Sequence, residues 1–341
     1  MRYAKKLIIF LVVSMALLAN SAHASISNKR TLCVFDLVGA NGDFYGIMKD
    51  FKTAALGWGV DIELKPYTDE KIAAEDLKAK QCDGALLTGI RGRQFISYTG
   101  SMDSIGAIPD YDAMRMVVSI LASGNPKVNP HLVSGPYEFG GLVPMGAAYL
   151  FVKDNSIDTV EELAGKSIAV LEYDVAEANM AKRVGMSPVM SDITNFSTRF
   201  NNGSVDTCFA PIFGYSALEL YKGMQPDGGI IDLVLGQLSA QLILRKDLFP
   251  TDFADQSRKY LAGQFDRAMR IINNADGEVN EKWWINISDA ETTRYDEMFR
   301  QARIDLANQG VYNKDMMSLL RKVRCKSNPS RAECVNPVRV I

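Results

Sequence analysis

The stretch LAGKSIAVLEYDVAEANMAKRVGM, residues 163–186, predicts a turn, a buried β-strand and an amphipathic helix in direct succession. Glu172, Tyr173 and Asp174 stand at the junction between the strand and the helix. In open α/β sheets, ligands bind in the crevice at the carboxyl ends of the strands, because helix N-termini and free loop amides converge there. These three side chains are therefore the starting point for a candidate ligand site.

Strands and helices alternate on both sides of this stretch. Short apolar or alternating runs predict strands, and apolar side chains at helical spacing predict helices. The predicted strands are residues 30–37, 60–67, 83–89, 147–154, 166–172, 187–192 and 205–211, and the predicted helices are residues 42–59, 69–81, 159–165, 174–185, 195–203 and 216–224. This alternation implies parallel sheets with right-handed crossovers, so the predicted fold class is α/β with two similar lobes.

The connection between the lobes depends on three segments. A Pro- and Gly-rich stretch from Gly124 to Gly146 predicts a surface loop. We expect the chain to cross between lobes near residues 145–152 and again near residues 230–244, within a long β-rich segment. Beyond this segment the sequence is almost entirely helical, and Ser288 opens one helix that Gly310 ends.

The first residues predict a secretory signal peptide that is cleaved after Ala24. A short basic region precedes an apolar run, Leu7 to Ala19, and a small-x-small cleavage site follows. No later stretch is long and apolar enough for a transmembrane helix, so we expect a soluble protein exported to the periplasm.

The charge of the chain argues against nucleic acid as a partner. The formal net charge is −2, and removal of the three basic residues of the leader leaves −5. The mature chain has no basic run, whereas phosphate binding requires a clustered positive face. We expect a monomer that binds no nucleic acid.

Five cysteines in an exported chain predict disulfides with one thiol left over. Cys325 and Cys334 flank the polar loop KSNPSRAE, where a bridge would restrain the C-terminal tail. Cys33, on the first predicted strand, and Cys82, at the start of the third, can meet if these strands are neighbours. Cys208 is then a buried free thiol, and the lack of any Cys-x-x-Cys sequence gives redox or zinc chemistry little support.

The residue content also argues against an enzyme. The mature chain holds a single histidine, His131, which leaves no second imidazole for a metal site and no evident triad partner. The sequence GANGDFYG, residues 39–46, follows a strand and opens a helix, but its glycines do not have the spacing of a dinucleotide-binding loop. We interpret it as a tight turn that exposes helix amides, and we expect no cofactor and no metal.

The order of signal peptide, α/β lobe, crossing strand, second α/β lobe, return strand and C-terminal helices resembles the TRAP-type periplasmic solute-binding proteins. The resemblance is strong over residues 156–211 and loose over most of the mature chain. The matching positions are Glu162, Leu163, Gly165, Lys166, Ile168, Val170, Gly185, Gly203, Val205, Asp206 and Pro211. The chain also resembles the AdeT-type proteins, which have been labelled as efflux-pump components.

This resemblance implies a two-lobe, type II-like periplasmic binding protein fold with crossing strands and C-terminal helices. Lobe I would comprise residues 25–146 and 243–341, and lobe II residues 147–242. The function implied is capture of a small molecule in the interlobe cleft for a TRAP-like transporter in the inner membrane. An exported soluble protein cannot itself be a membrane pump. The alternative is an envelope accessory protein, associated with efflux, that has lost solute binding.

One departure from the family pattern bears on specificity. The arginine that clamps a carboxylate in this family would fall at Ala169, and its polar pair before the final proline would fall at Phe209 and Ala210. A methyl group cannot replace a bidentate guanidinium. We therefore expect simple organic acids to bind poorly, and a neutral, zwitterionic or cationic solute to be favoured.

The predicted ligand-binding residues come from loops at the carboxyl ends of strands in both lobes. They are Asn41, Asp43, Phe44, Thr88, Arg91, Tyr149, Glu172, Tyr173 and Phe213. Tyr173 and Phe213 would supply aromatic faces, and Glu172 a counter-ion. Several polar and aromatic side chains of these loops have a structural alternative. Asp174 and Glu177 are interpreted as caps of the helix that follows, Phe213 can be a core residue, and Arg91 and Arg93 can be solvated or paired side chains.

Overall fold

The computed structural model describes residues 28–335, so the predicted signal peptide, residues 1–24, lies outside the described residues. A single mixed sheet runs through the molecule in the order β2-β1-β3-β9-β5-β8-β6-β7, with β10 paired to β9 and β4 to β5. Within residues 28–335, no helix combines the length and the apolar character needed to cross a membrane.

The strands are β1 (Asn28–Phe35), β2 (Val60–Tyr67), β3 (Gly84–Thr88), β4 (Val133–Ser134), β5 (Tyr137–Val152), β6 (Ser167–Leu171), β7 (Ser187–Ser191), β8 (Thr207–Pro211), β9 (Gly229–Arg245) and β10 (Trp284–Ile285). The α-helices are α2 (Asp43–Leu56), α3 (Glu70–Lys78), α4 (Gly89–Gly92), α5 (Ser97–Gly100), α6 (Tyr111–Ala122), α7 (Val175–Arg183), α8 (Phe196–Asn201), α9 (Gly214–Ala217), α10 (Tyr221–Met224), α11 (Phe253–Gly263), α12 (Phe265–Asp276), α13 (Asp289–Asn308), α14 (Lys314–Ser327) and α15 (Ala332–Val335). Short 3₁₀ helices are η1 (Gly39–Asn41), η2 (Ser101–Asp103), η3 (Asn129–Leu132), η4 (Glu161–Leu163), η5 (Lys246–Leu248) and η6 (Glu281–Trp283).

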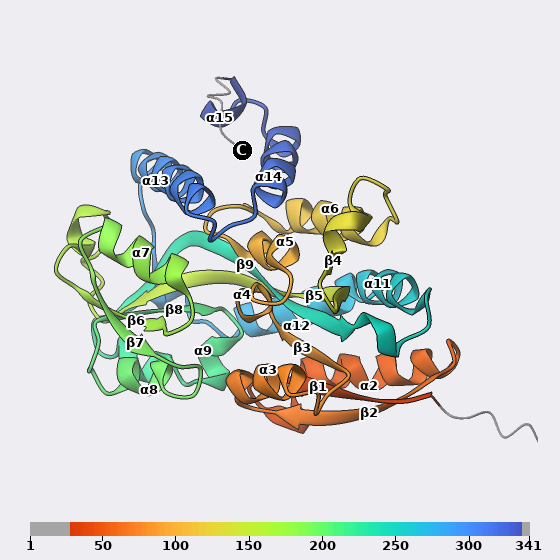
Figure 1. The fold of residues 1–341 in the computed structure, drawn as a ribbon. Coiled ribbons are helices and arrows are strands. Elements are labelled where there is room, and N and C mark those ends of the chain that lie inside the picture. Colours follow the sequence, from red (N-terminus) through yellow and green to blue (C-terminus); the bar gives the residue numbers. More distant parts are fainter. Residues whose placement is uncertain (1–27, 336–341) are drawn as a thin grey trace, which may run out of the picture.

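The predicted α/β fold class is confirmed. In the first lobe β1 pairs in parallel with β2 and β3, and in the second lobe β6 pairs in parallel with β7 and β8. The two groups of strands lie at opposite ends of the sheet, each with its own connecting helices (Figure 1). The carboxyl ends of β3 and β6 therefore belong to different lobes, and the loops that follow them meet between the lobes.

Two long antiparallel strands, β5 and β9, join the lobes. They pair with each other over most of their length, while β9 also pairs with β3 and β5 also pairs with β8. The predicted crossing segments, residues 145–152 and 230–244, fall within these two strands, which confirms that prediction. The exact lobe boundaries stay a prediction.

The loop predicted for Gly124 to Gly146 is wrong over its second half. β5 begins at Tyr137, and buried side chains such as Phe139 and Leu142 point from it into the core. The glycines and Pro144 that suggested a loop stand at shifts in the β5–β9 register, where a bulge tolerates residues that a regular ladder excludes.

The single helix predicted for residues 216–224 is also wrong. The structure has two one-turn helices there, α9 and α10, and Glu219 between them adopts a positive φ of 53°. A left-handed residue ends the helical hydrogen-bond pattern, so the chain turns instead of continuing.

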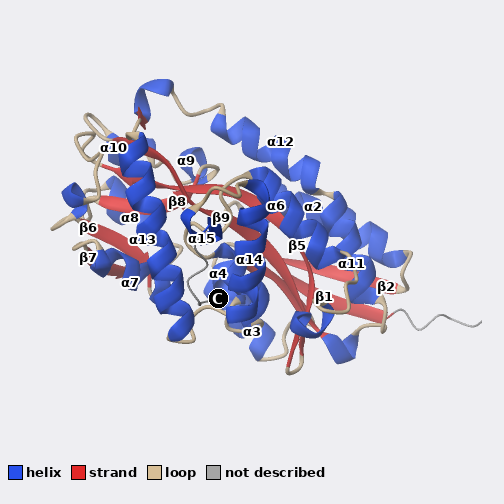
Figure 2. Ribbon diagram, turned by 90° about the horizontal axis from the view of Figure 1, so that it is seen from above, coloured by secondary structure: helices blue, strands red, loops and turns tan. Residues whose placement is uncertain are grey.

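The C-terminal helices cover both lobes. α13, whose N-cap Ser288 accepts the amide of Glu291 as its sequence predicts, buries Tyr295 and Phe299 with apolar residues of the second lobe. α14 packs with α6 in the core cluster of the first lobe. Seen from above, α13 and α14 lie in front of the sheet, and α12 runs along one edge of the molecule (Figure 2).

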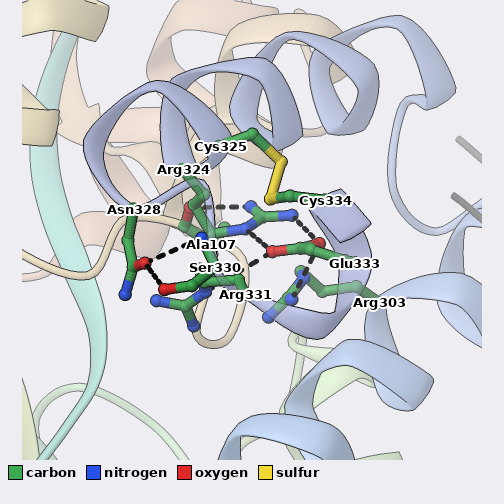
Figure 3. Close-up of a disulfide and its surroundings, with 9 residues drawn as sticks. All are labelled: Ala107, Arg303, Arg324, Cys325, Asn328, Ser330, Arg331, Glu333 and Cys334. Atoms are coloured by element: carbon green, nitrogen blue, oxygen red, sulfur yellow. Dashed lines mark hydrogen bonds and ion pairs between the residues drawn. A yellow bond between two sulfur atoms is a disulfide. The ribbon is translucent and has the colours of Figure 1, made fainter. Parts of the chain in front are cut away.

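Both predicted disulfides are present. Cys33 and Cys82 join β1 to the start of its neighbour β3, with their Cα atoms 5.9 Å apart. Cys325 and Cys334 link α14 to α15 with a Cα separation of 5.6 Å (Figure 3). Cys208 is a buried free thiol, as expected. The side chain of Asp76 lies near Cys33 and Cys82, but the two sulfur atoms are bonded to each other and do not form a metal site with it.

Candidate ligand site between the lobes

The three residues at the junction of β6 and α7 all contact the first lobe. Nζ of Lys71 lies 2.8 Å from Oε1 of Glu172, and this pair is exposed. The hydroxyl of Tyr173 donates a hydrogen bond to Oε2 of Glu70 at 3.0 Å. Asp174 is paired with Nη1 of Arg93 at 3.2 Å, and this pair is largely buried. The junction between β6 and α7 is therefore a region of direct polar contact between the second lobe and the first.

Tyr173 belongs to a buried charged cluster. The Arg91 guanidinium carbon lies 3.2 Å from the centroid of the Tyr173 ring, a cation–π contact, and Arg91 Nε lies 3.8 Å from Oε2 of Glu70. The amide of Thr88 donates to the other oxygen of Glu70. Burial raises the pKa of Glu70 and that of Tyr173. Arg91 is thus engaged by Glu70 and Tyr173, while its buried Nε makes no hydrogen bond within the described residues.

Asp174 has two roles. Its carboxylate accepts the amide of Ala176 at 3.1 Å, so it caps α7 as interpreted from the sequence, and it also pairs with Arg93. Glu177 does not add a second cap. Its carboxylate accepts the amide of Leu171, at the end of β6, at 2.8 Å. This bond is formed across the loop because α7 folds back over β6.

The backbone amides around the turn at residues 39–46 donate hydrogen bonds to the side chain of Asp36. Asp36, a residue that sequence reasoning missed, accepts the amides of Val38, Phe44 and Tyr45 at 3.0–3.1 Å. Gly42 lies against this carboxylate so closely that a side chain there would collide with it. The N-terminal amides of α2 are therefore already used, which leaves them unable to hold a phosphate. The clue in the sequence was an acidic residue immediately after β1.

A cavity of about 50 Å³, which we call the cleft cavity, lies between the lobes. Its walls are mostly apolar, and they include Thr88, Ile90, Ala169, Tyr173, Phe209 and Phe213. Of the nine predicted ligand-binding residues, Thr88, Tyr173 and Phe213 line this cavity.

The other six predicted residues lie outside the cleft cavity. Phe44 packs edge-on against Phe213, with ring centroids 5.5 Å apart, and Arg91 lies against Tyr173. Glu172 is paired with Lys71 on the exposed side of the junction. The remaining three are Asn41 and Asp43, which are exposed at the start of α2, and Tyr149, which packs against Trp284.

A second cavity of about 90 Å³, which we call the rear cavity, lies between α7, α13 and β9. Ile90, Glu177 and Phe209 line both cavities, so they form a shared wall. Burial raises the pKa of Glu177 well above its usual range, and the nearby charge of Asp174 adds to the effect. Sequence reasoning treated Glu177 as a cap, because nothing local showed that its carboxylate borders two cavities.

Asp103 borders the rear cavity and anchors β9. It accepts the hydroxyl of Ser239 at 2.6 Å and the amide of Ser239 at 2.9 Å. Burial raises the pKa of Asp103 to about 7. A carboxyl whose pKa is raised by folding adds stability that is complete below the unfolded-state pKa of about 4 and is lost progressively as the pH rises from there through the folded-state pKa of about 7.

Asp103→Asn should remove this pH dependence. Between about pH 5 and pH 7 we expect the unmodified chain to lose about 1 kcal/mol of unfolding free energy per pH unit relative to the variant, close to the limit for one proton. Urea denaturation of both proteins across this range measures the difference. A constant difference between the two curves would contradict the expectation.

The fold and the apolar cavity between two lobes define a periplasmic solute-binding protein fold of the TRAP type. The TRAP periplasmic solute-binding protein of Desulfovibrio salexigens, solved with bound orotic acid, matches with a TM-score of 0.73 at 12% identity, over 88% of this chain and 99% of that chain. That of Haemophilus influenzae, solved with bound L-gulonate, matches with a TM-score of 0.70 at 11% identity, over 86% of this chain and 99% of that chain.

The chain belongs to the family described as solute-binding protein AdeT 1/2, whose model matches residues 53–337. It is 44% identical over 301 residues to the "Probable solute-binding protein AdeT1" of Acinetobacter baumannii. The aligned region covers 88% of this chain and 98% of that protein. The family is described by solute binding and not by catalysis, which agrees with the sequence-based expectation of a protein that is not an enzyme.

Proposed function

We propose that this protein is exported to the periplasm, captures a small molecule between its lobes and delivers it to a TRAP-like transporter of the inner membrane. The fold and the family membership support this role. The two crossing strands, β5 and β9, suit hinge closure, because each lobe moves as a body about a few strand residues. The apolar cavity between the lobes is the observation that carries the proposal.

The specificity we propose is atypical for the fold. Two structural neighbours hold orotic acid and L-gulonate, which are organic acids. Here the family's carboxylate-binding arginine would fall at Ala169, which presents only a methyl group to the cleft cavity. Glu177 lies in the wall of the same cavity. An entering carboxylate would find no guanidinium at this position, and the ionised form of Glu177 would repel it. The solute should therefore be neutral, zwitterionic or cationic.

Calorimetry of the purified protein, freed of co-purified ligand, tests this specificity. Succinate and gulonate should bind with dissociation constants above about 1 mM, which corresponds to a binding free energy weaker than about 4 kcal/mol. A single Ala169→Arg change would place the new guanidinium in the same wall as Glu177, and the Glu177 carboxylate would neutralise its charge. The double variant Ala169→Arg/Glu177→Gln should therefore gain at least about tenfold in affinity for these acids, as a bidentate arginine pair allows.

Glu172→Gln serves as the control, because Glu172 is paired with Lys71 outside the cavity and should not affect acid binding. Micromolar binding of succinate by the unmodified protein, unchanged by the substitutions at positions 169 and 177, would overturn the proposed specificity.

The alternative function, an envelope accessory protein without a solute, is favoured by one observation. The lobes already contact each other through Lys71–Glu172, Glu70–Tyr173 and Arg93–Asp174, and the cleft cavity between them is small. A thermal-shift screen of metabolites and a pull-down from membrane fractions distinguish the two functions. Stabilisation by a solute supports the binding protein, whereas a specific envelope partner together with no stabilising solute supports the accessory protein.

A further inference from the structure

Glu177 is a carboxylate that borders two cavities and has no cationic partner. Within residues 28–335 its one hydrogen bond is to the amide of Leu171, through Oε2, and no lysine or arginine forms an ion pair with it. Its second oxygen, Oε1, is left free to receive a donor. Because an unpaired charge in an apolar wall is costly, this carboxylate requires either a proton or a cation supplied from outside the protein.

The rear cavity offers a second polar group without a partner. The hydroxyl of Tyr295 is buried, it makes no hydrogen bond within the described residues, and Tyr295 is 3% exposed. Much of the remaining wall is aliphatic or thioether, with side chains such as Ile105, Leu163 and Met180. Such a wall accepts hydrocarbon and adapts to its shape, because methionine side chains are flexible.

The other acidic groups of this cavity are already engaged. Asp174 is paired with Arg93, and Asp103 accepts two hydrogen bonds from Ser239. Glu177 is therefore the acidic group at the shared wall that remains available to a ligand.

We propose that the Glu177 carboxylate binds the protonated amine of an apolar ligand. The hydrocarbon part of this ligand occupies the rear cavity. A second polar atom, in ligands that carry one, reaches the hydroxyl of Tyr295. This inference rests on the proposed function and names its ligand class as small alkylamines. The rear cavity, of about 90 Å³, is smaller than the cavity of about 150 Å³ that holds benzene, so it suits a short alkyl chain. The amine would then lie at the wall that the rear cavity shares with the cleft cavity.

Three probes with one hydrocarbon chain and different head groups test the proposal: n-pentylamine, 1-pentanol and pentanoate. Titration calorimetry of the ligand-stripped full chain near neutral pH should show pentylamine binding at least tenfold more tightly than pentanol, and pentanoate binding more weakly than either. Glu177→Gln keeps an oxygen to accept the amide of Leu171. It should reduce the preference for pentylamine over pentanol to less than threefold and leave pentanol binding unchanged.

Two further variants keep the result interpretable. Glu172→Gln removes an exposed carboxylate near the same junction and should leave the preference for the amine unchanged. Ala181→Phe places a ring into the rear cavity, of which Ala181 forms part of the wall, and should abolish binding of both pentylamine and pentanol. If Glu177→Gln does not fold, loss of amine binding in Ala181→Phe alone still supports the rear cavity as the site.

Equal affinity of the unmodified protein for pentylamine and pentanoate would overturn the proposal, and so would an unchanged amine preference in Glu177→Gln. A solute found by the metabolite screen that binds Glu177→Gln as tightly as the unmodified protein would overturn the amine site while leaving the solute-binding function intact. A protein that no solute stabilises, and that binds none of the three probes, would contradict both.

Discussion

Glu333→Ala should lower the free energy of unfolding by about 3–5 kcal/mol, the range expected when a buried ion pair loses one partner. The Glu333 carboxylate accepts hydrogen bonds from Nε and Nη2 of Arg324, at 2.6 and 2.8 Å, and lies 3.8 Å from Arg303 (Figure 3). Arg324 and Arg303 are 3% and 5% exposed, so the substitution leaves two buried cations without their carboxylate. Urea denaturation near neutral pH measures the loss.

The same cluster predicts a characteristic response to acid. Burial alone would raise the pKa of Glu333, but the hydrogen bonds and charge of Arg324, followed by the charges of Arg303 and Arg331, hold it below its usual range. A depressed folded-state pKa adds stability above the unfolded-state pKa, and this stability is lost as the pH falls through the folded-state pKa. The difference between Glu333→Ala and the unmodified chain should therefore shrink in acid.

Glu297→Ala is the matched control for Glu333→Ala. Glu297 is a largely exposed carboxylate paired with Arg300 on α13, and its removal should cost no more than about 1 kcal/mol. Comparable losses in the two variants would contradict the view that burial of the Glu333 cluster sets its energy.

The disulfide beside this cluster could be predicted from the sequence, but the ion pairs could not. Cys325 and Cys334 enclose a short polar loop, and that local pattern is sufficient to expect a bridge. Arg303 comes from the preceding long helix, and nothing in the sequence aligns it with Glu333 until α13 and α14 have packed. The same is true of Glu177, whose position between two cavities depends on how α7 folds over β6.

The candidate site divides in a similar way. The junction between β6 and α7 could be located from the sequence, because strand ends and helix caps are local features. Its side chains, however, pair with Glu70, Lys71 and Arg93 across the cleft, and such partners depend on how the lobes meet. The first half of β5 was missed because its glycines and Pro144 resemble loop signals, whereas the register shifts opposite β9 accommodate them.

Arg93→Leu should shift the protein toward an open arrangement of its lobes. Arg93 and Asp174 form a largely buried pair across the cleft, and loss of the cation leaves the Asp174 carboxylate unpaired in the closed arrangement. Breaking such a pair costs about 3–5 kcal/mol while the site stays buried. Separation of the lobes exposes Asp174 to water and avoids most of this cost, so the unfolding free energy should fall by less than this range. Small-angle scattering should show a larger radius of gyration, and a solute that binds the closed form should bind more weakly in proportion to the closed fraction.

Asp174→Asn makes the Arg93 experiment specific to the charge. Asparagine is as good a helix N-cap as aspartate, so this variant keeps the cap of α7 and removes only the ion pair. The double variant Arg93→Leu/Asp174→Asn leaves neither charge buried and should close again to a large extent, which a double-mutant cycle would report as a coupling energy. Lys71→Met breaks only the exposed Lys71–Glu172 pair and should change closure by no more than about 1 kcal/mol. An unchanged scattering profile for Arg93→Leu, with the full loss appearing in the unfolding free energy, would show that the pair stabilises the folded chain without controlling the cleft.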